Sequence, residues 1–222
     1  MSHAHPLPIP AIDFQHFVIR PLTADDTEAY RALRRRILEV GDGRYHSASY
    51  RRDKTFETEE KMRAWCTETH EHCVMGTFYD GELVGIMTAV AEGPKENLLA
   101  SWDSVWLDAR FRKLGIAKHA YQKLEEWTKK NGYRYVETFV RADNHRVLGI
   151  RKKRGSLHIY TKRKEVWADG SVEDAHFFIT HLFPATREEK DGYSRAIIHL
   201  KTILSSLEGE SAAEDPLQQK TT

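Results

Sequence analysis

Residues 112–117 read Arg112-Lys113-Leu114-Gly115-Ile116-Ala117, and this short stretch separates two contrasting segments. The segment before it, Leu98 to Leu107, is an extended apolar run that predicts a strand. The segment after it, Gly115 to Asn131, repeats apolar residues at helical spacing, and Gly132 follows where a left-handed helix cap is expected. The chain is therefore predicted to run strand, tight turn and helix, with a glycine at the helix start.

A helix that begins in a glycine turn can bind a phosphate. Its first N–H groups have no intrahelical partner and carry a partial positive charge. Because Gly115 has no side chain, an anion can approach these groups closely. The same turn also occurs as a plain contact between a helix and a strand, so the turn alone leaves both interpretations open.

The pattern Arg112-x-x-Gly115-x-Ala117 resembles the pyrophosphate loop of the GCN5-related N-acetyltransferases (GNAT). The preceding segments, Trp106-Leu107-Asp108 and Arg110-Phe111-Arg112, resemble that family's passage from strand to loop, and the resemblance spans residues 17–182. It implies acetyl-coenzyme A as co-substrate and a primary amine as acceptor. It also implies an acyl carbonyl polarised by the backbone N–H of Leu107, and a coenzyme contact from Asn144. The full set of coenzyme-binding candidates is Leu107, Arg112, Lys113, Leu114, Gly115, Ile116, Ala117 and Asn144.

The bulk composition limits the function classes. The chain has 222 residues and is 40% hydrophobic, which suits one domain with a sizeable core. Its 34 Lys and Arg nearly balance its 33 Asp and Glu, so the total charge indicates neither a nucleic-acid nor a membrane partner. The two cysteines, Cys66 and Cys73, stand in no short ligand motif, so we expect no metal site, no disulfide framework and a cytoplasmic location.

Strand and helix signals alternate around the glycine loop, and hairpin signals flank this region. The turn Asp80-Gly81 between two apolar β-rich runs is a strong hairpin signal. We therefore predict an α/β (α+β) fold with a mixed, mostly antiparallel central sheet flanked by helices, as in GNAT-like acyl-CoA N-acyltransferases. Strands are expected at 17–20, 73–79, 82–91, 98–107, 133–140, 157–167 and 175–182. Helices are expected from Thr23 through Leu38, at 58–70, at 115–131, between 144 and 155, and at 194–207. In the first of these helices, the three arginines at 34–36 are expected on a solvated face.

The predicted domain organisation has four parts. Residues 1–15 form a flexible N-terminus and 16–185 the acetyltransferase domain. Residues 186–207 form a C-terminal extension with an amphipathic helix, and the polar residues 208–222 a disordered tail.

Asp103 is the candidate general base that would remove a proton from the amine. It lies four residues before Leu107, so strand alternation predicts that both side chains are on the same face. Some members of the resembling family carry a carboxylate base at this place. The alternative is an aspartate on a solvated strand face, and the sequence leaves both open.

The leaving thiolate is where this chain departs from the resembling family. Many members have a tyrosine near the coenzyme sulfur, and that position is Arg151 here. Arginine cannot donate a proton at neutral pH but can stabilise a thiolate by charge. Tyr160 could instead supply the proton, and Arg151 could simply face solvent.

Two other function classes compete with an N-acetyltransferase. A non-catalytic acyl-CoA-binding or regulatory module would explain the missing tyrosine. A nucleic-acid-binding protein would use the basic runs 151–154 and 162–164, but these have little aromatic interleaving. The acceptor is left open between a small-molecule and a peptide amine, and the sequence also leaves a homodimer open.

Overall fold

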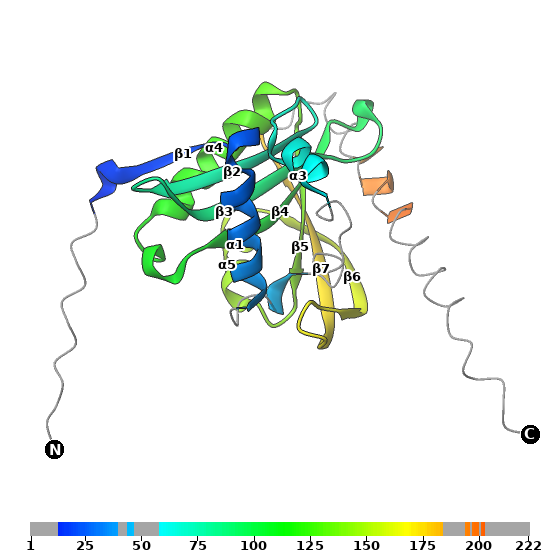
Figure 1. The fold of residues 1–222 in the computed structure, drawn as a ribbon. Helices are drawn as coiled ribbons and strands as arrows, with labels where there is room; N and C mark the ends of the chain where they lie inside the picture. The colour runs from blue at the N-terminus through cyan, green and yellow to red at the C-terminus, as the bar shows by residue number, and fades with distance from the viewer. Residues whose placement is uncertain are drawn as a thin grey trace, which may run out of the picture.

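The computed structural model describes residues 13–39, 44–46, 58–183, 194–195, 197–199 and 201–202. Within these residues seven strands form one sheet in the order β1-β2-β3-β4-β5-β7-β6 (Figure 1). Only the β4–β5 pair is parallel. The predicted mixed, mostly antiparallel sheet is therefore confirmed. The strands are β1 (Phe17–Pro21), β2 (His72–Tyr79), β3 (Glu82–Ala91), β4 (Leu99–Leu107), β5 (Tyr135–Arg141), β6 (Leu157–Val166) and β7 (Val172–His181).

Helices cover both faces of the sheet. Helix α1 (Thr27–Glu39) and helix α3 (Glu59–Cys66) pack on one face, where they bury Val74, Ile86 and Trp106. Helix α4 (Ile116–Lys130) packs on the other face, over Met87 and Trp102. Because side chains alternate along a strand, neighbouring residues serve the two layers. These are called the α1 face and the α4 face below, and Figure 1 shows α1 crossing in front of the strands.

The pairing between β4 and β5 is short. It joins Leu99 to Tyr135, Ala100 to Val136 and Ser101 to Glu137, and it stops there. Residues 102–107 of β4 and 138–141 of β5 continue as strand without pairing with each other. This unpaired end of β4 and β5 lies near the glycine loop, which follows β4 after one turn of 3-10 helix, Ala109–Phe111.

Two local predictions are wrong. The helix expected at 58–70 ends at Cys66, because Thr67 is extended and the Thr69 hydroxyl accepts N–H bonds from Glu71 and His72. Such side-chain-to-backbone bonds compete with a helix. The expected solvated face at 34–36 fails for Arg34, which is buried because it shares the inner face of α1 with Tyr30 and Ile37.

The predicted C-terminal helix is partly described, and residues 194–195, 197–199 and 201–202 are helical. Ile197 packs against a cluster formed by Leu99, Tyr135 and Ile179. The His199 ring lies so close to Gly93 that a Cβ there would be 2.0 Å from its Nε2. The predicted disordered tail lies outside the described residues, as does the predicted N-terminus up to residue 12. Among the described helices, none combines the length and the apolar character needed to cross a membrane.

Candidate active site

The N-terminus of α4 is shaped to accept an anion. Gly115 caps the helix with φ of 86°, and Lys113 also has a positive φ of 67°, so the backbone curls tightly before the helix. Side chains cap α3 and α5 (His145–Lys153), but none caps α4. A Cβ built on Gly115 would meet no atom of the described residues within 4 Å. The N-terminus of α4 therefore has no capping side chain and no described atom crowding Gly115, as a phosphate site requires.

Arg112 braces the loop that leads into α4. Its Nε donates to the Leu107 carbonyl over 2.7 Å, and its guanidinium lies 5.8 Å from the centre of the Trp106 ring. The side chain therefore ties the end of β4 to the glycine turn, and its Nε is already used within the chain.

The N–H of Leu107 points away from β3. The next residue, Asp108, donates its N–H to the Val84 carbonyl of β3 over 2.8 Å. Successive N–H groups along a strand point to opposite sides, so the Leu107 N–H is directed toward the unpaired end of β4 and β5. The bond from Arg112 to the Leu107 carbonyl fits this orientation.

The prediction that Asp103 and Leu107 share a face is wrong. Asp103 is paired with Thr88 and Trp106 with Ile86, so three residue steps of β4 match two of β3. This β-bulge includes Ser104, whose φ is 51°. It places Asp103 on the α1 face with Trp106, and Leu107 on the α4 face. A bulge depends on the partner strand, so the period of β4 alone does not reveal it.

Asp103 belongs to a group of three carboxyls, Glu92, Asp103 and Glu137, called the acidic cluster below. The Ser101 hydroxyl donates to Asp103 Oδ2 over 2.9 Å, and Glu137 lies opposite Ser101 in the β4–β5 ladder. Burial raises the pKa of all three groups. The pKa of Glu137 reaches about 8, because repulsion from Asp103 and Glu92 adds to its burial. Sequence reasoning missed Glu92 and Glu137, although a charged residue inside the apolar run 133–140 was a usable signal.

Arg151 is buried on the α4 side of the sheet rather than exposed to solvent. It is 3% exposed, and its Nη2 donates to the Tyr121 hydroxyl of α4 over 3.3 Å. Its Nε and Nη1 have no hydrogen-bond partner among the described residues. Arg154 likewise turns inward, with a 2.6 Å bond to Glu125. The basic run 151–154 therefore joins α5 to α4 through two of its members, which weakens the nucleic-acid interpretation.

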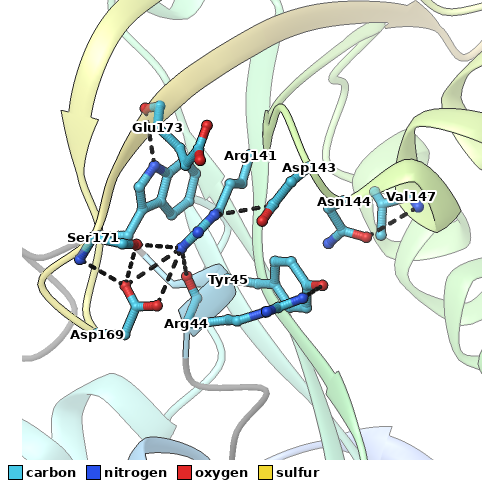
Figure 2. Close-up of polar contacts among 10 residues, drawn as sticks. Arg44, Tyr45, Arg141, Asp143, Asn144, Val147, Asp169, Ser171 and Glu173 are labelled. Carbon is cyan, nitrogen blue, oxygen red and sulfur yellow. Dashed lines mark hydrogen bonds and ion pairs between the residues drawn. The ribbon is translucent and has the colours of Figure 1, made fainter.

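Tyr160 and Asn144 lie apart from these groups. Tyr160 is on β6, the edge strand, which β7 separates from β5, and its ring centre is 6.2 Å from that of Phe177. The Asn144 side-chain oxygen accepts the Val147 N–H and so caps α5 (Figure 2). The structure thus brings Tyr160 next to neither Arg151 nor Asp103.

A buried arginine at the end of β5 holds two loops in place (Figure 2). Nη1 of Arg141 donates to Ser171 Oγ over 2.7 Å and to the Arg44 carbonyl over 3.1 Å. Its guanidinium also forms ion pairs with Asp143 and Asp169, at 2.9 and 3.4 Å. Residues 44–46 and the β6–β7 turn are therefore fixed beside the start of α5.

Comparison with known proteins now places the chain in a family. The model of the acetyltransferase (GNAT) family matches residues 43–155, slightly more than half of the 222 residues. The chain therefore belongs to the GNAT family of acetyltransferases. The comparison with curated proteins gives no match.

Solved structures share the fold at low sequence identity. A GNAT-family acetyltransferase from Streptococcus pneumoniae matches with a TM-score of 0.64 and 17% identity, covering 74% of this chain and 99% of that one. The ribosomal-protein-S5-alanine acetyltransferase from Vibrio fischeri matches at 0.61 and 15%, with coverages of 77% and 95%. The ribosomal-protein-S18-alanine N-acetyltransferase from Escherichia coli matches at 0.56 and 15%, with coverages of 77% and 97%. These matches establish the GNAT acyltransferase fold.

Proposed function

We propose that the chain transfers an acetyl group from acetyl-coenzyme A to a primary amine, within a domain spanning residues 16–185 and located in the cytoplasm. The observation that carries the proposal is the N-terminus of α4, which has no side-chain cap, is uncrowded at Gly115, and lies near the unpaired end of β4 and β5. In the reaction a bond forms between the amine nitrogen and the acetyl carbon, and the carbon–sulfur bond breaks. The co-substrate supplies a reactive thioester, and the chain supplies binding, orientation and proton transfer.

The glycine loop would hold the pyrophosphate. The donors are the backbone N–H groups of residues 113–117, supported by the partial positive charge of the helix N-terminus. Arg112 adds charge nearby, although its Nε is used to brace the loop. The side-chain oxygen of Asn144 is used to cap α5, so its amide nitrogen is the proposed coenzyme contact.

The backbone N–H of Leu107 would polarise the acetyl carbonyl. Its direction toward the unpaired end of β4 and β5 supports this role, because a donor aimed at the developing negative charge lowers the barrier. Such a donor is rigid because both its neighbour Asp108 and its own carbonyl are hydrogen-bonded.

Asp103 would remove the proton from the attacking amine. Its place on the α1 face, at the level where β4 leaves β5, supports this role, because the reacting group is proposed to lie at the unpaired end of these strands. Burial raises the pKa of its carboxyl, which makes it a stronger base than an exposed aspartate. Transfer through an intervening water would serve equally.

Arg151 would stabilise the departing thiolate. Its two unpartnered nitrogens sit in a buried setting, where a charged donor interacts strongly with an anion. A thiol has a pKa of about 8.5, so its thiolate leaves without needing a proton. The amine and its base would then use the α1 face, and the thiolate the α4 face. Tyr160 is the alternative proton donor, although it lies farther away, on the edge strand β6.

Measurement of thiol release across a panel of primary amines, with calorimetric titration of acetyl-coenzyme A in parallel, tests the proposal. Gly115→Glu should abolish coenzyme binding, because its carboxylate would occupy the pyrophosphate position. Gly132→Glu is the matched control: Gly132 has φ of 89°, faces open space and follows the other end of α4. Unchanged affinity in folded Gly115→Glu would remove the phosphate-loop assignment. Coenzyme binding without turnover of any amine would favour the non-catalytic acyl-CoA-binding module.

A further inference from the structure

The acidic cluster collects three carboxyls at one place on the α1 face. Ser101 and Glu137 form the last rung of the β4–β5 ladder, and Asp103 follows two residues later on β4. Glu92 comes directly after β3, and its carboxyl interacts with the Ser101 hydroxyl. The cluster therefore lies at the start of the unpaired end of β4 and β5.

No basic side chain of the described residues compensates this charge. The causes that move the three pKa values are burial, the Ser101 hydroxyl and repulsion among the carboxyls themselves. No ion pair joins any of the three to a Lys, Arg or His within the part of the chain that the structure describes. Burying carboxylates without a cationic partner is costly, and Glu137 avoids part of this cost by holding its proton. A cation bound at the cluster could replace that proton.

A buried hydroxyl beside the cluster also lacks a partner. Thr88 is 1% exposed, lies opposite Asp103 across the β3–β4 ladder, and its Oγ1 has no hydrogen bond within the described chain. Glu137, on the neighbouring strand β5, is 7% exposed. Both groups can accept hydrogen bonds, and a cation with N–H donors would supply these bonds and compensate the carboxyl charge.

An ammonium group fits this requirement better than a metal ion. The described residues contain no group of three or more His, Cys, Asp or Glu with the spacing of a metal site. An ammonium brings three N–H donors at hydrogen-bond length, which matches carboxyl and hydroxyl acceptors spread over neighbouring strands.

We propose that Glu92 and Glu137 bind a second ammonium group of the acceptor, so that the preferred acceptor is a diamine or polyamine. This inference rests on the proposed function, in which Asp103 serves the reacting amine. The backbone positions of Asp103 on β4 and Glu137 on β5 are offset by two residues along the strand direction, which is about 6.6 Å and comparable with the length of a four-carbon diamine.

The first test compares 1,4-diaminobutane with 1-aminobutane as acceptors in the thiol-release assay. We expect kcat/KM to be at least tenfold higher for the diamine. Glu137→Gln and Glu92→Gln should each remove most of this preference by raising KM for the diamine more than KM for the monoamine. Glu126→Gln, on the exposed side of α4, is the control and should keep the preference. Equal use of both amines, or a preference that survives in both variants, would overturn the inference.

The second test measures binding without turnover. Titration calorimetry of 1,4-diaminobutane at pH 7 in two buffers of different ionisation enthalpy reports proton release. Because the pKa of Glu137 is about 8, the free protein holds that proton and should release it when the ammonium binds. Binding with proton release in the wild type but not in Glu137→Gln would support the inference even if no amine were acetylated, which would refute only the proposed function. Turnover of amines without diamine binding would refute the inference alone.

Discussion

Replacement of Glu137 by glutamine should make the protein more stable at high pH and leave it nearly unchanged at low pH. Glutamine keeps the shape of the side chain and removes its ionisation. In the native protein burial raises the pKa of this carboxyl from 4.5 to about 8, with repulsion from Asp103 and Glu92 adding to the effect. In the unfolded chain the same group titrates near its ordinary value of about 4.3.

The direction of the pH dependence of stability follows from which state, native or unfolded, binds the proton. Between pH 4.5 and about 8 the native state holds a proton that the unfolded state has lost, so stability falls as pH rises through this window. The favourable contribution is complete below pH 4.5 and is lost above about pH 8. This difference in pKa between the native and unfolded states corresponds to about 5 kcal/mol. That is a large fraction of the usual unfolding free energy of about 5–15 kcal/mol.

Urea denaturation of wild type and Glu137→Gln at several pH values from 4 to 9 measures this directly. The difference in unfolding free energy should be close to zero at pH 4 and grow to several kcal/mol in favour of the variant at pH 9. Glu126→Gln should follow the wild type at every pH, because its side chain is exposed. Parallel curves for wild type and Glu137→Gln would refute the reasoning.

The remaining predictions concern the other groups of the site. Asp103→Asn should lower turnover by about 10²-fold or more, most strongly at low pH, with coenzyme affinity retained; a wild-type pH profile would place Asp103 outside the chemistry. Arg151→Ala should lose about ten- to hundredfold in turnover, while Arg151→Lys and Arg151→Tyr retain part of it. If Tyr160 is the proton donor, Tyr160→Phe should show that loss and the Arg151 series should be flat. Arg141→Gln should destabilise the fold by about 3 kcal/mol, because it breaks a buried ionic network. In that variant the amide of Ala168, which donates to the His46 carbonyl, should exchange hydrogen faster.

Local chemistry predicted much of the fold. The turn Asp80-Gly81 correctly joins β2 and β3, because both residues adopt the positive φ that a tight hairpin needs. The apolar spacing after Gly115 correctly gave α4, with its ends within one residue of those predicted. In both places the residues that decide the structure are neighbours in sequence, so one segment contains the whole signal.

Features that depend on distant segments were not predictable in the same way. The bulge at Ser104 arises from the register between β3 and β4. The burial of Arg151 depends on Tyr121, thirty residues earlier on another helix. Glu92 and Glu137 join Asp103 only because the strand order brings three segments together. Family resemblance indicated one base and one phosphate loop, and it contained no information on these additional contacts.

The three rungs that join β4 to β5 have a mechanical consequence. They make the sheet two smaller sheets, β1 to β4 and β5 to β6, that share a short seam in the middle of the protein. A ligand lying along the unpaired strands would add hydrogen bonds across that seam and so act as a further strand. We expect the protein without its proposed co-substrate, acetyl-coenzyme A, to unfold locally first at this seam. Its lifetime in a cell should then increase with the concentration of acetyl-coenzyme A.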